Sequence, residues 1–135
     1  MKKYISLLFL VVIAIFSCKP PTPAITNEVA ENTEPLVLRD ITVEEAAEKI
    51  STGEAIFVDV RTDKEITGGI IPGSVHIDMS SPNFEMKLNE LDKQKEYVVY
   101  CKAGGRSAKA CKKMKELGFA NINNMMGGFT KWKNK

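Results

Sequence analysis

Cys101 is the residue in this sequence with the clearest capacity for chemistry. It follows the apolar run 97–100 and precedes a loop of small and charged residues at 102–106. Small residues and glycines let a backbone curl with its N–H groups pointing inward, as in an anion-binding nest. A helix expected from Arg106 adds positive potential at its N-terminus, and Lys102 and Arg106 add full charges. These features favour thiolate over thiol, so Cys101 is predicted to be a nucleophile with a lowered pKa rather than a small buried core residue.

Alternating strand and helix patterns surround this loop. The apolar runs 55–60 and 97–100 are typical of strands that are covered on both faces. Shorter strand patterns occupy 36–38, 75–77 and 121–125, and capping boxes at Thr42 and Thr62 predict two helices. Further helical patterns cover 84–91 and 106–117, and a terminal helix follows Gly127-Gly128. The alternation predicts an α/β fold, with a mainly parallel sheet and helices on both faces.

The first 35 residues have a different composition. Two lysines precede an uncharged run at 4–16, which is too short for a membrane span of about 17–25 residues and suits a signal peptide. The sequence Ile15-Phe16-Ser17-Cys18 resembles the lipobox of bacterial lipoproteins, in which the cysteine is lipidated; an uncleaved anchor helix is the alternative. Proline-rich, polar sequence follows. We therefore expect a signal peptide at 1–17, a flexible tether at 18–35 and a folded domain at 36–135, exported to the cell envelope and anchored to a membrane through Cys18.

Composition excludes several classes of protein. The 135 residues carry a formal net charge of +2, three cysteines and one histidine. Three cysteines are too few for a disulfide scaffold, and no zinc pattern is present. The charge is uneven, with nine basic residues and one acid from residue 97 onward. Either these lysines, including those at 109, 112, 113 and 115, cover solvated helix faces, or they form a basic rim near Cys101. Nucleic-acid binding is not expected.

Three ordered motifs carry a resemblance to a known family. Cys101-x4-Arg106 after a strand resembles the active-site loop of rhodanese domains, which are sulfurtransferases. The segment 57–61, with Glu65, residues 69–74 and Ile77, resembles the N-terminal signature of the family, and 127–129 with Trp132 resembles its C-terminal one. Gly69 departs from the family, which commonly has a histidine there. The resemblance implies a single rhodanese-like domain.

The resemblance also implies a mechanism. Cys101 would take a sulfur atom from a small anionic donor such as thiosulfate, hold it as a persulfide and pass it to a thiol or cyanide acceptor. No metal or organic cofactor is implied, and a monomer is expected. The residues expected to bind substrate are Lys102, Ala103, Gly104, Gly105 and Arg106.

Other residues are assigned supporting or packing roles. Asp59, Arg61 and Glu65 are expected to support the loop structurally. Asp59 and Arg61 are placed on opposite sides of a strand end, and the resemblance implies that such residues support the active-site loop or pair with an acid such as Glu65. His76 is interpreted as a packing or surface residue, and Cys111 and Trp132 as core residues.

Three other functions stay open. The chain could be a non-catalytic module that holds sulfur or a partner. It could be an oxyanion enzyme, such as a phosphatase or arsenate reductase, although phosphatases of related fold use a longer C-x5-R loop. It could also use Cys101 and Cys111 in thiol–disulfide exchange.

Overall fold

The computed structural model describes residues 37–135. The predicted signal peptide, Cys18 and the tether at 18–35 lie outside the described residues. Within the described part, no helix is long and apolar enough to cross a membrane.

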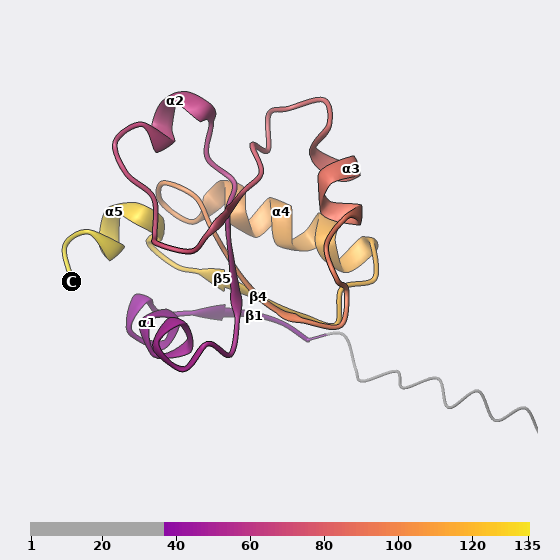
Figure 1. The fold of residues 1–135 in the computed structure, drawn as a ribbon. Coiled ribbons are helices and arrows are strands. Elements are labelled where there is room, and N and C mark those ends of the chain that lie inside the picture. The colour runs from indigo at the N-terminus through magenta and orange to yellow at the C-terminus, as the bar shows by residue number, and fades with distance from the viewer. Residues whose placement is uncertain (1–36) are drawn as a thin grey trace, which may run out of the picture. The chain divides into compact units, whose positions relative to one another are not determined.

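A single five-stranded parallel sheet organises the domain (Figure 1). Its order is β1-β5-β4-β2-β3, and every neighbouring pair is parallel. The strand that follows β4 in the chain is β5 and the strand that follows β2 is β3, and these two strands flank the β4–β2 pair on opposite edges, so a topological switch point lies between β4 and β2. Ligands of open α/β sheets bind outside the carboxyl ends of the strands at such a point. The strands are β1 Val37–Ile41, β2 Ile56–Asp59, β3 Val75–His76, β4 Glu96–Tyr100 and β5 Asn121–Met125.

Helices cover both faces of the sheet, as predicted. Helices α3 and α4 pack on one face, and α1 and α5 pack on the other (Figure 1). The capping boxes at Thr42 and Thr62 are both formed and begin α1 and α2. The helices are α1 Val43–Thr52, α2 Asp63–Ile66, α3 Phe84–Asn89, α4 Gly105–Glu116 and α5 Gly128–Trp132.

The first strand is longer than the sequence predicts. The predicted strand covers 36–38, whereas β1 continues through the polar residues Arg39 and Asp40 and pairs with β5 as far as Ile41 and Met125. Polar side chains on β5 satisfy both residues: the Arg39 Nε donates to Asn123 Oδ1 at 2.7 Å, and Asp40 accepts a bond from Asn124. Hydrogen bonds to side chains on β5 therefore allow these two polar residues to continue the strand.

A buried ion pair closes the carboxyl end of β2. The expectation that Asp59 and Arg61 lie on opposite sides of the strand is wrong, because residues two apart share a side. The Arg61 Nη2 lies 2.6 Å from Asp59 Oδ2, and the two residues are 3% and 0% exposed. Arg61 also donates to the carbonyl of Gly69 at 2.7 Å. The turn at Gly69 thus contributes its backbone to this pair.

This pair gives a stability prediction. Asp59→Ala leaves a buried guanidinium without its carboxylate and is expected to lower the free energy of unfolding by about 3–5 kcal/mol. The double variant Asp59→Ala/Arg61→Met should be more stable than Asp59→Ala, because no unpaired charge remains. Urea unfolding measures both, and a single variant within about 1 kcal/mol of wild type would contradict the assignment.

Candidate active site

The Cys101 thiol lies at the carboxyl end of β4, under the loop that leads to α4. The residue is 2% exposed, and the amide of Gly104 donates to its Sγ at 3.1 Å. Gly104 has a φ of +105°, in the left-handed region that glycine favours, and no side chain caps α4. The first amides of the helix therefore remain available for an anion at the sulfur.

Hydrogen bonds at this site favour the thiolate. Burial acts to raise the pKa of Cys101, but bonds from the Ser107 amide and hydroxyl and from the amides of Ala103 and Gly104 outweigh it. The pKa of the thiol is consequently held below its usual value. Cys111 contrasts with it, because burial raises the pKa of that thiol to about 12. Only one of the two described cysteines thus has the properties of a nucleophile.

Ser107 connects the sulfur to a buried polar chain. Its hydroxyl lies 3.6 Å from the Cys101 Sγ and 2.6 Å from Asn124 Oδ1. The orientation of the Asn124 amide is fixed from β1, because its Nδ2 donates to Asp40 Oδ1 at 2.7 Å. The Ser107 hydroxyl has a single proton, which the sulfur and two carbonyl oxygens share as possible acceptors.

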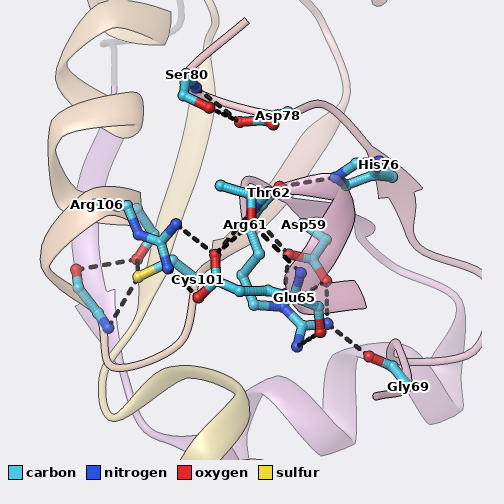
Figure 2. Close-up of polar contacts among 12 residues, drawn as sticks. Asp59, Arg61, Thr62, Glu65, Gly69, His76, Asp78, Ser80, Cys101 and Arg106 are labelled. Carbon is cyan, nitrogen blue, oxygen red and sulfur yellow. Dashed lines mark hydrogen bonds and ion pairs between the residues drawn. The ribbon is translucent and has the colours of Figure 1, made fainter. Parts of the chain in front are cut away.

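Arg106 is held by a carboxylate instead of standing free. Its Nη1 and Nη2 reach the two Glu65 oxygens at 2.7 and 2.6 Å, a bidentate pair (Figure 2). The bonds from Arg106 lower the pKa of Glu65 to about 2, so the pair stays ionised at neutral pH. The pKa of Arg106 is raised mainly by Glu65 and in smaller part by Cys101. Arg106 therefore faces the sulfur as a fixed, largely compensated charge.

The N-terminus of α5 holds the outer side of the loop. The amide of Phe129 donates to the carbonyl of Cys101 at 2.8 Å, and that of Thr130 donates to the carbonyl of Lys102 at 3.0 Å. This approach requires glycine at 128, where a Cβ would overlap the Cys101 carbonyl oxygen and lie 2.8 Å from the Ala103 nitrogen. The carbonyls of Cys101 and Lys102 are therefore turned outward, which leaves the amides of the loop to face the sulfur.

The structure gathers the sequence-predicted residues around one point. Glu65 supports the loop through Arg106, whereas Asp59 supports it less directly, through the Arg61 side chain that stacks 3.9 Å from the Phe129 ring. Lys102, Ala103 and Gly105 are exposed on the loop, and Gly104 is buried beneath it. In residues 37–135, no group of three or more His, Cys, Asp or Glu could hold a metal ion.

Sequence reasoning missed two elements of the site. Ser107 and Asn124 received no role, although a serine directly after the arginine and two asparagines in a buried strand were visible signals. His76 was interpreted as a packing or surface residue, and its Nε2 lies 2.7 Å from the carbonyl oxygen of Arg61 (Figure 2). Cys111 is fully buried and free in α4.

The comparisons with known proteins agree on one family. The family model described as Rhodanese-like domain matches residues 42–135. The Bacillus subtilis protein named "Putative sulfurtransferase YtwF" is 40% identical over 96 residues, covering 70% of this chain and 90% of the relative. The Allochromatium vinosum protein named "Sulfurtransferase" is 29% identical over 97 residues, covering 71% and 89%. A crystal structure from Staphylococcus saprophyticus has a TM-score of 0.63 at 39% identity and covers 70% of this chain and 92% of its own.

The hydrogen bonds to sulfur predict the effect of one substitution. Ser107→Ala removes a hydroxyl that stabilises the thiolate, so the pKa of Cys101 should rise by about one unit. The rate of Cys101 alkylation at pH 7 should then fall by up to about tenfold, while the rate at high pH stays the same. Ser51→Ala, on the exposed face of α1, is the matched control. An unchanged pH profile for Ser107→Ala would show that the hydroxyl does not act on the sulfur.

Proposed function

The chain belongs to the rhodanese-like domain family, and on that premise we propose that it is a sulfurtransferase that carries sulfur as a persulfide on Cys101. Relatives named as sulfurtransferases support sulfur transfer as the general activity. The donor class proposed is thiosulfate, and the acceptor is a thiol, or cyanide in an assay.

In the first half-reaction the Cys101 thiolate attacks the outer sulfur of thiosulfate. A new S–S bond forms at Cys101, the bond between the two thiosulfate sulfurs breaks, and its electron pair leaves with sulfite. The terminal sulfur of the persulfide carries the negative charge. Amides of the loop and the first turn of α4 stabilise that charge.

In the second half-reaction an acceptor thiolate attacks the terminal sulfur. The S–S bond to Cys101 breaks, and Cys101 leaves as the thiolate that the loop already stabilises. The same hydrogen bonds therefore serve the nucleophile of the first step and the leaving group of the second.

One observation supports this proposal most directly: the Gly104 amide and the Ser107 hydroxyl both reach the sulfur of Cys101. Phosphate or arsenate chemistry is less well supported, because C-x4-R gives a small cradle and Glu65 already occupies both ends of the Arg106 guanidinium. A module that only stores sulfur would differ in lacking the second half-reaction. The proposal also gives supporting roles to Asp59, Arg61 and Glu65. It further includes a monomeric state, and export with lipidation of Cys18.

Intact-mass measurement of the full chain after incubation with thiosulfate tests the proposal. We expect wild type to gain the mass of one sulfur atom, and cyanide to remove it. Cys111→Ser is the matched control and should gain the same mass, whereas Cys101→Ser should gain none. A wild-type protein that gains no mass while Cys101 remains alkylatable would contradict transfer from thiosulfate.

A further inference from the structure

A cavity of about 240 Å³ adjoins the outer side of the active-site loop. The α2 region forms one wall, and the loop and α5 form the other. This volume exceeds the needs of cyanide or thiosulfate and suits a small organic molecule. The residues used below are Arg61, Glu65, Lys102, Phe129, Thr130 and Lys133.

The charges around this cavity do not balance. Arg61 is neutralised by Asp59, and Glu65 is neutralised by Arg106. Lys102 and Lys133 are exposed, and neither has a carboxylate within ion-pair distance among residues 37–135. Two free ammonium groups thus line a cavity whose other charges are paired, which favours an anionic ligand.

The cavity is also fixed relative to the sulfur. Lys102 follows Cys101 directly, and its carbonyl accepts the Thr130 amide at 3.0 Å. The Phe129 ring lies between the Arg61 guanidinium at 3.9 Å and the Lys133 Nζ at 5.6 Å. Residues of α5 are therefore held against the loop that would carry the persulfide.

We propose that this cavity binds the sulfur acceptor, a small thiol that carries carboxylate groups, and that Lys133 contributes to its selection. The inference rests on the proposed function and specifies its second half-reaction. The acceptor carboxylates lie against the Lys102 and Lys133 ammonium groups, and the Thr130 hydroxyl, which is exposed, adds a donor. The acceptor sulfur then approaches Cys101 from the Lys102 side, because Lys102 lines the cavity and directly follows Cys101.

The reaction at this site balances without a further reagent. The terminal sulfur of the persulfide takes one proton from water, and the acceptor thiolate R–S⁻ then attacks that sulfur in Cys101–S–SH. The products are R–S–SH and the Cys101 thiolate, so one S–S bond forms as another breaks. The persulfide proton stays on the transferred sulfur.

The test separates the loading of Cys101 with sulfur from discharge, the transfer of that sulfur to an acceptor thiol. The full chain is first loaded with thiosulfate, freed of small molecules and assayed for persulfide by intact mass. Discharge is then timed in a single turnover with mercaptosuccinate, which has two carboxylates, or with uncharged 2-mercaptoethanol, each rate being expressed per thiolate. The variants are Lys133→Glu and Lys133→Gln, with Lys115→Glu at the far end of α4 as the matched control.

We expect Lys133→Glu to slow discharge by mercaptosuccinate about tenfold and Lys133→Gln to slow it about threefold, with rates for 2-mercaptoethanol within twofold of wild type. Lys115→Glu should match wild type with both thiols. Equal effects on both thiols, or a Lys133 variant no slower than Lys115→Glu, would overturn the inference. A Lys133 effect on loading alone would also overturn it, because the residue would then act on the donor. A wild-type protein that does not load refutes the proposed function, which is a different result.

Discussion

The sulfur of Cys101 receives amide hydrogen bonds because the loop around it is held from its outer side. Helix α5 donates two amides to the carbonyls of Cys101 and Lys102, and these peptide groups are then unable to rotate inward. The Gly104 amide and the first turn of α4 face the sulfur as a result. Amide dipoles stabilise a charge that develops during a reaction most effectively when they are already oriented toward it.

Two ion pairs make this arrangement rigid. Arg61 and Asp59 close the end of β2, and the Arg61 side chain also packs on Phe129, which belongs to the helix that holds the loop. Glu65 fixes Arg106 beside the sulfur while its own helix is begun by the capping box with Thr62. Since these charges are compensated, Lys102 and Lys133 carry the positive charge that an anionic ligand meets next to the loop.

The parts of the site that could be predicted from sequence depend on local patterns. Apolar runs revealed β2 and β4, capping boxes revealed α1 and α2, and the spacing of Cys101 and Arg106 revealed the loop. The chain from Ser107 through Asn124 to Asp40 escaped prediction because its members are distant in sequence and meet only when β5 pairs with β1. The extension of β1 was missed for the same reason, since its polar residues have partners on β5. The pairing of Asp59 with Arg61 was local, and it was missed because their sides on the strand were misassigned.

The reactivity of Cys101 in a Gly128→Ala variant tests whether α5 controls the thiol, because the added methyl would separate α5 from the loop. Gly53→Ala is the matched control: Gly53 has a similar positive φ of +69°, against +54° at Gly128, and its Cβ would meet no atom within 4 Å. The measurement is the rate of Cys101 alkylation at pH 7 in each folded variant. We expect the alkylation rate to fall about tenfold or more in Gly128→Ala and to equal the wild-type rate in Gly53→Ala. Wild-type reactivity in Gly128→Ala would contradict the claim that α5 sets the state of the thiol through the loop.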